Sequence, residues 1–144
     1  MTESKQGQSK TFMEMLNDML IQKYGKKIVE LGSEPKNYHA LSDANGYVSY
    51  TGPCGDTMKI WVKIKADVIE DIGFQTDGCD CTRAVGSILT EMVKGADIQK
   101  AMEITPLQID EALDGLPDDH KHCAVLARDA LHKVITGYLE GGRA

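Results

Sequence analysis

The sequence lacks three features by which common classes of protein are recognised: a long apolar run, a surplus of basic residues and a dense set of cysteines. None of its apolar runs approaches the roughly 20 residues needed to cross a bilayer, and residues 1–10 lack the apolar core of a signal peptide. Aspartate and glutamate number 22 against 16 lysines and arginines, which gives a net charge of -6. Because a nucleic-acid binder needs a basic face to displace counterions, this charge argues against such a partner. We therefore expect a cytoplasmic protein that binds neither membrane nor nucleic acid.

Cysteine is scarce, with only four among 144 residues. The cytoplasm keeps thiols reduced, so these cysteines are predicted to be metal-binding or reactive groups and not structural disulfides. The length fits one domain, and the hydrophobic fraction of 42% and charged fraction of 26% are typical of soluble globular proteins.

The N-terminal part of the chain divides into two segments. Residues 1–10 are polar and are predicted to be a disordered tail. From Thr11 the apolar residues recur at steps of three and four, and Thr11 with Glu14 fits a capping box, so residues 11–32 are predicted to be a helical extension. Residues 33–144 then form the main domain, and residues 11–144 together are expected to be one globular unit.

The main domain begins with strands and ends with helices. Residues 58–65 alternate apolar and polar side chains, which is the period of a half-buried strand. The predicted strands are 47–51, 58–65 and 68–76, and the predicted helices are 82–94, 97–102, one opening at 105–106 and ending before 117, and 123–139. This order predicts an α+β fold, in which a three-stranded antiparallel sheet carries helices packed on one face.

The four cysteines occur in settings that favour chemistry over packing. Cys54 lies in a predicted loop between two strands, Cys79 and Cys81 lie where a strand gives way to a helix, and Cys123 follows His122 at the start of the last helix. Unpaired N–H groups and the helix dipole at a helix N-terminus lower the pKa of a thiol. We therefore expect thiolates, the form that binds iron or zinc and attacks sulfur donors.

Each of these residues also has a plainer interpretation. A single free cysteine is often buried and inert, but these are flanked by glycine or charged residues and do not lie on apolar stripes. Asp56 and His122 are candidate oxygen and nitrogen ligands, although Asp56 also suits a turn residue and His122 a solvated helix cap. Taken alone, the cluster of His120, Lys121 and His122 is interpreted as a polar surface.

Several segments in order along the chain resemble the IscU/NifU family of iron–sulfur cluster assembly scaffolds, from about residue 23 to residue 140. The matching segments are Glu34–Asn37, Gly52–Asp56 with its Cys-Gly-Asp, Phe74–Cys79 with its terminal Gly-Cys, Thr90–Gly95, and His122–Ala130, which is similar to the family's His-Cys-Ser-x-Leu-Ala-x-Asp-Ala. The resemblance covers nearly the whole main domain.

The resemblance implies a ligand set for the metal. Cys54, Cys79 and Cys123 would be the cluster cysteines, Asp56 would keep the cluster labile, and His122 would be a candidate fourth ligand. Cys81 is an extra thiol that the family pattern lacks, and it offers an alternative arrangement with all four cysteines as ligands.

A second departure from the family pattern concerns the chaperone. The family's Leu-Pro-Pro-Val-Lys stretch, recognised by a chaperone in some systems, is replaced here by Leu116-Pro117-Asp118-Asp119-His120. This replacement puts chaperone-assisted transfer in doubt.

The implied function is that of a scaffold and not of an enzyme. It would assemble a [2Fe–2S] cluster with sulfur from a cysteine desulfurase and iron from an iron donor, and pass the cluster to apo-protein acceptors. Zinc is an alternative occupant of the same residues. Residues 1–22 extend the usual N-terminus and are candidates for covering a sheet edge or for a homodimer contact.

Two other functions fit part of the pattern. A zinc-dependent sulfur carrier similar to the SufU branch would use three thiolates and one Asp or His. That branch carries an insertion between the second and third cysteine motifs, however, and the short sequence separation between Cys79 and Cys123 resembles the form without it. A thiol–disulfide redox protein would use Cys79 and Cys81, because a strained Cys-x-Cys disulfide is labile, yet it leaves Cys54, Asp56 and Cys123 without a role. A plain structural zinc domain, which chelation would unfold, is the remaining alternative.

Overall fold

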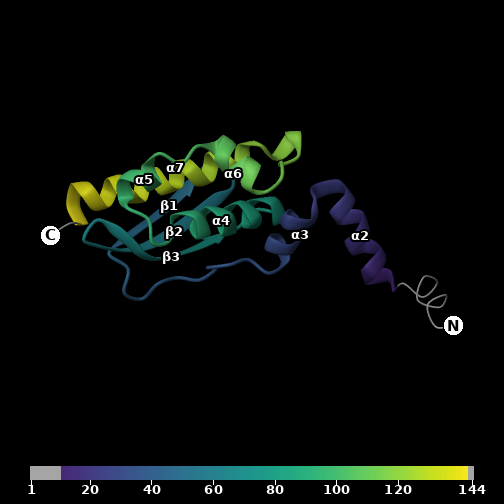
Figure 1. The fold of residues 1–144 in the computed structure, drawn as a ribbon, viewed down its shortest axis with the longest axis horizontal. Helices are drawn as coiled ribbons and strands as arrows, with labels where there is room; N and C mark the ends of the chain where they lie inside the picture. Colours follow the sequence, from purple (N-terminus) through teal and green to yellow (C-terminus); the bar gives the residue numbers. More distant parts are fainter. Residues whose placement is uncertain (1–10, 143–144) are drawn as a thin grey trace.

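The computed structural model describes residues 11–142, so the predicted disordered tail at residues 1–10 lies outside the described residues. The elements in chain order are α2 (Phe12–Tyr24), α3 (Lys26–Ser33), β1 (Gly46–Thr51), β2 (Thr57–Lys65), β3 (Val68–Thr76), α4 (Asp80–Val93), α5 (Ile98–Met102), α6 (Pro106–Ala112), η1 (Asp118–His120), α7 (His122–Gly137) and η2 (Tyr138–Gly142). Figure 1 shows α4 and α7 lying along the sheet.

The strands form one antiparallel sheet in the order β1-β2-β3, as the sequence predicts. Ala66 and Asp67 both adopt positive φ, 54° and 61°, between Lys65 and its partner Val68. Two such residues are what a tight two-residue hairpin needs to match the twist of its strands. Along β2 the even-numbered residues from Met58 to Ile64 are buried, which directs one face of the sheet to the core.

The core lies between that face and the helices α4 and α7. Its largest fully buried side chains include Phe74, Ile28, Met58, Ile60, Ile69, Ile72, Leu89 and Leu131. Gly86 on α4 packs directly over the sheet, because a Cβ at this position would come within 2.2 Å of Cε2 of Phe74. The predicted α+β architecture, with helices on one face of a three-stranded sheet, is therefore confirmed.

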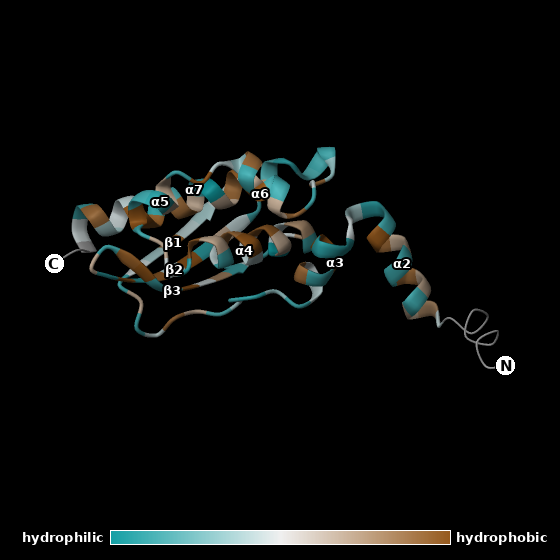
Figure 2. Ribbon diagram, viewed as in Figure 1, coloured by the Kyte–Doolittle hydropathy of each residue, from teal (hydrophilic) through white to brown (hydrophobic). Residues whose placement is uncertain are grey.

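The N-terminal residues form two helices that break at Gly25. α2 lies wholly within the described residues and buries none of its side chains, and Phe12 is 73% exposed. Figure 2 shows that α2 projects away from the rest of the fold and carries apolar segments. α3 instead buries Ile28 and Val29 and packs against α4. The homodimer contact suggested for the N-terminal segment stays a prediction.

Within residues 11–142, the helices are all too short or too polar to cross a membrane.

Candidate metal centre

The ends of three separate elements carry the cysteines. Cys54 lies in the loop between β1 and β2, Cys79 is the N-cap residue of α4, Cys81 is in the first turn of α4, and Cys123 is in the first turn of α7. All four, each within the described residues, are free thiols. Cys54 and Cys79 are exposed, whereas Cys81 and Cys123 are each 1% exposed.

The first group of potential ligands consists of Cys54, Asp56 and His122. Their ligand atoms all lie within 4.8 Å of one another. The loop that carries the first two is held by backbone hydrogen bonds from Gly52 N to Asp56 O and from Gly55 N to Gly52 O, each 3.0 Å. Gly55 has a φ of +94°, a conformation that glycine adopts without strain. The sequence analysis names Asp56 and His122 as candidate ligands, and the structure places both close to Cys54 in this group.

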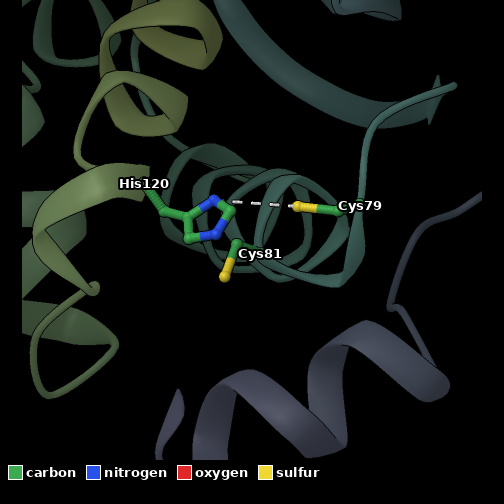
Figure 3. A group of neighbouring side chains, drawn as sticks. All are labelled: Cys79, Cys81 and His120. Carbon is green, nitrogen blue, oxygen red and sulfur yellow. Dashed lines mark hydrogen bonds between the residues drawn. The ribbon is translucent and has the colours of Figure 1, made fainter. Parts of the chain in front are cut away.

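The second group consists of Cys79, Cys81 and His120, whose ligand atoms also lie within 4.8 Å of one another. Figure 3 shows His120 extending from η1 toward the start of α4, and its Nδ1 is 3.9 Å from Sγ of Cys79. The sequence analysis interpreted His120 as a polar surface residue and missed it as a potential ligand. The available signal was the run from His120 to Cys123, which gathers three metal-binding side chains within four residues.

Cys123 connects the two groups. Its sulfur is 3.9 Å from Nε2 of His122 in the first group. The hydroxyl of Thr82, which is fully buried, lies 3.4 Å from the Cys123 sulfur and 3.9 Å from the Cys79 sulfur in the second group. The three predicted cluster cysteines thus come to the same end of the fold, but they belong to two neighbouring groups and not to one compact set. Their assignment as ligands stays a prediction.

Burial opposes the ionisation of the two inner thiols. It raises the pKa of Cys123 to about 11, and the hydrogen bond with Thr82 offsets this only in part. It raises the pKa of Cys81 to about 12, with the neighbouring Cys79 adding to the effect. The expectation that the N-terminus of α7 would lower the pKa of Cys123 is therefore wrong, because the loss of solvent around the buried thiol is the largest effect on it. A metal ion would have to displace the proton from each of these thiols.

Arg83 fixes the turn that presents Cys79. Its Nε donates a hydrogen bond of 2.8 Å to Gly32 O on α3, and its Nη1 donates one of 3.3 Å to Gly78 O. Its Nη2 forms an ion pair with Asp80. One guanidinium group therefore ties α3, the end of the Cys79 turn and the first turn of α4 together.

A hollow of about 410 Å³ lies next to the first group. It is lined by Tyr50, Gly52, Pro53, Cys54, His122, Val125, Leu126 and Asp129. Apolar and polar side chains thus meet around the exposed sulfur of Cys54, at a place where a second molecule can approach it.

The fold and the site define a small α+β protein with two groups of Cys, His and Asp side chains at one end of the sheet that could hold a metal ion. The chain belongs to the family of the NifU-like N terminal domain, which matches residues 23–143. This match confirms the resemblance to the IscU/NifU family.

Curated relatives agree with this assignment. The chain is 43% identical over 116 residues to iron–sulfur cluster assembly scaffold protein IscU 1 of Archaeoglobus fulgidus, covering 80% of this chain and 76% of that protein. It is 44% identical over 119 residues to the scaffold protein IscU of Aquifex aeolicus, covering 81% and 76%. It is 40% identical over 119 residues to the nitrogen fixation protein NifU of Azotobacter chroococcum, covering 80% of this chain but only 38% of that longer protein.

Solved structures share the fold. FiSufU of Fervidobacterium islandicum, described as a scaffold of the SUF system, superimposes with a TM-score of 0.67 at 18% identity, covering 80% of this chain and 98% of that one. The N-terminal part of a NifU-like protein of Brucella abortus gives a TM-score of 0.64 at 18% identity, covering 81% and 94%. At such identities the likeness concerns the fold alone, so it does not favour the SufU-type function over the IscU type.

Proposed function

We propose that the protein is a scaffold on which an iron–sulfur cluster is assembled and from which it is passed to other proteins. The observation that carries the proposal is the meeting of Cys54, Cys79 and Cys123, from three distant parts of the chain, at one end of the fold. The membership in the NifU-like family, and the scaffold function in the names of the IscU relatives, support the same conclusion. The reducing cytoplasm is the compartment that suits free thiols of this kind.

The cluster is the cargo of this protein. A [2Fe–2S] cluster commonly takes four protein ligands, mostly thiolates. Cys54, Cys79 and Cys123 would supply three, and Asp56 or His122 the fourth. An oxygen or nitrogen ligand binds iron less firmly than a thiolate, which suits a carrier that must release its cluster. Zinc is the alternative metal for the same residues.

The exposed thiols are the candidates for receiving sulfur. In this step the thiolate of Cys54 or Cys79 attacks the outer sulfur of a persulfide on a cysteine desulfurase. A new S–S bond forms on the scaffold, the S–S bond in the partner breaks, and the partner's thiolate leaves. Cys81 and Cys123 are unsuited to this step because each is 1% exposed. An iron donor and apo-protein acceptors complete the proposed set of partners.

The test is anaerobic assembly with ferrous iron, cysteine and a cysteine desulfurase, followed by visible absorption and iron and sulfide content. We expect the wild-type protein to acquire cluster absorption and to transfer it to an apo-acceptor. Most of the cluster absorption should be lost in each of the variants Cys54→Ala, Cys79→Ala and Cys123→Ala. The control is His39→Gln, at an exposed histidine outside both groups, and it should behave as the wild type. Cluster yields that are unchanged in all three cysteine variants would overturn the proposal.

A further inference from the structure

The second group has the spacing of a single-ion site. The ligand atoms of Cys79, Cys81 and His120 lie within 4.8 Å of one another, and the Cys79 sulfur is 3.9 Å from Nδ1 of His120 (Figure 3). Tetrahedral zinc, with bonds of about 2.3 Å to sulfur and about 2.0 Å to nitrogen, holds such atoms roughly 3.5–3.8 Å apart. Small side-chain movements would therefore close this group around one cation.

His120 is already oriented for this role. With Nδ1 toward Cys79, its Nε2 lies 3.8 Å from the carboxylate of Asp119, so a small movement would bring the two into hydrogen-bond distance. A histidine that binds a metal through one nitrogen commonly donates the N–H of the other to a carboxylate, which fixes the ring. The Tyr24 ring and the imidazole lie edge to face at a centroid distance of 6.0 Å, and the His122 ring is stacked with the imidazole at 6.3 Å.

We propose that Cys79, Cys81 and His120 form a site for one zinc or ferrous ion, separate from the group of Cys54, Asp56 and His122. Two thiolates and an imidazole are the donors that both ions accept. Cys81 lies in the core and Cys79 faces solvent, so the cation would sit at the surface of the fold with its fourth position open to water.

The site has a consequence for the cluster, and this consequence alone rests on the proposed function. Cys79 belongs both to the second group and to the predicted cluster cysteines. A cation held by Cys79, Cys81 and His120 therefore withdraws Cys79 from the cluster, and the two states exclude each other.

The experiment starts from the full chain carrying Cys54→Ser, Asp56→Ala and His122→Gln, which disables the first group. Zinc affinity is measured anaerobically by competition with a chromophoric chelator, and cobalt(II) replaces zinc to report thiolate charge-transfer absorption. We expect this background to bind one zinc ion. Adding Cys81→Ser or His120→Gln should lower the affinity by at least about tenfold, the lower limit seen when even an outer-sphere partner is removed. Adding His39→Gln, the matched histidine control, should leave the affinity unchanged.

Because Cys81 is buried, its replacement can also unfold the protein, and two further readouts avoid that change. In the triple-variant background, zinc should protect the exposed Cys79 from alkylation, and it should shift the Nδ1 resonance of His120 in nitrogen-15 spectra. The proposal is overturned if zinc leaves both signals unchanged, or if His120→Gln leaves the zinc affinity intact. Neither readout involves cluster assembly, so a negative result in both would not count against the proposed scaffold function.

Discussion

The Thr82 hydroxyl lies 3.4 Å from the sulfur of Cys123, fully buried between α4 and α7. It is the polar partner that lowers the pKa of this thiol against the effect of burial. Thr82, which is not itself a candidate ligand, therefore influences the pH at which Cys123 becomes a thiolate.

Thr82→Val removes this hydrogen bond and keeps the shape of the side chain. We expect the pKa of Cys123 to rise further above about 11, because only the burial and like-charge effects remain. Cluster assembly at neutral pH should be slower, and the alkylation of Cys123 should need a higher pH. Thr90→Val is the matched control, since Thr90 is fully buried on the same helix and bonds to the carbonyl oxygen of Gly86. Equal alkylation profiles for the two variants would contradict this role for Thr82.

The raised thiol pKa values predict how the metal-free protein responds to alkali. The pKa values of Cys123 and Cys81 are about 11 and about 12 in the fold, against an ordinary 9.0. Because the folded values lie above the unfolded ones, this contribution to stability is fully present below pH 9 and is lost as the pH rises through 11 and 12. We expect the free energy of unfolding, from urea titrations under reducing conditions, to fall above pH 9. The double variant Cys81→Ala and Cys123→Ala should lose less over the same range; an equal loss would count against the prediction.

Asp56 and Cys81 give opposite predictions for cluster release. If Asp56 keeps the cluster labile, Asp56→Ala should slow transfer to an apo-acceptor severalfold, while the cluster still forms. Cys81→Ala should leave the transfer rate within a factor of two if three cysteines suffice, and should speed it if all four hold the cluster. The measurement is the decay of scaffold cluster absorption against acceptor activity. Unchanged rates in both variants would remove both residues from the ligand set.

Arg83→Gln removes the ion pair with Asp80 and the bonds to the carbonyl oxygens of Gly32 and Gly78. Hydrogen bonds from a charged donor contribute about 1.5–3 kcal/mol, so we expect a loss of that order in the free energy of unfolding. Arg128→Gln is the control, because within residues 11–142 the ion pair of Arg128 is with its sequence neighbour Asp129 alone. Its loss should stay below about 1 kcal/mol.

The Arg83 variant also tests the link to the site. The lost bonds hold the turn before α4, so Cys79 should be alkylated faster in Arg83→Gln than in Arg128→Gln. Equal stability and equal alkylation in the two variants would show that the guanidinium group does not fix this turn.

Gly86 and Gly137 form a matched pair of helical glycines. A Cβ at Gly86 would approach Cε2 of Phe74 to 2.2 Å, whereas a Cβ at Gly137 would meet none of the described atoms within 4 Å. Gly86→Ala should therefore destabilise the protein by about 1–3 kcal/mol through overpacking. Gly137→Ala should stabilise it by up to about 1 kcal/mol through helix propensity. Urea denaturation of both variants checks the pair, and a stabilised Gly86→Ala protein would show that α4 does not press on the sheet as described.

The sequence by itself predicted most of the secondary structure. The antiparallel strands expected at 58–65 and 68–76 correspond to β2 and β3, and their bounds agree within one residue. The helix expected at 82–94 runs from Asp80 to Val93, and the one expected at 123–139 becomes α7 followed by η2. These features depend on periodicity and turn residues over a few neighbouring positions, so they can be inferred without knowing how the chain packs.

The sequence also predicts that the cysteines are the chemically active residues, with Asp56 and His122 as further candidate ligands, and this stays a prediction. The sequence analysis missed His120 as a potential ligand, because its partners Cys79 and Cys81 are some 40 positions away in the chain. It also predicted a lowered pKa for Cys123, whereas the pKa of this thiol is raised. Both outcomes depend on how α4 and α7 pack together on the sheet. That packing decides which distant side chains meet and which lose their solvent, and only the tertiary structure contains it.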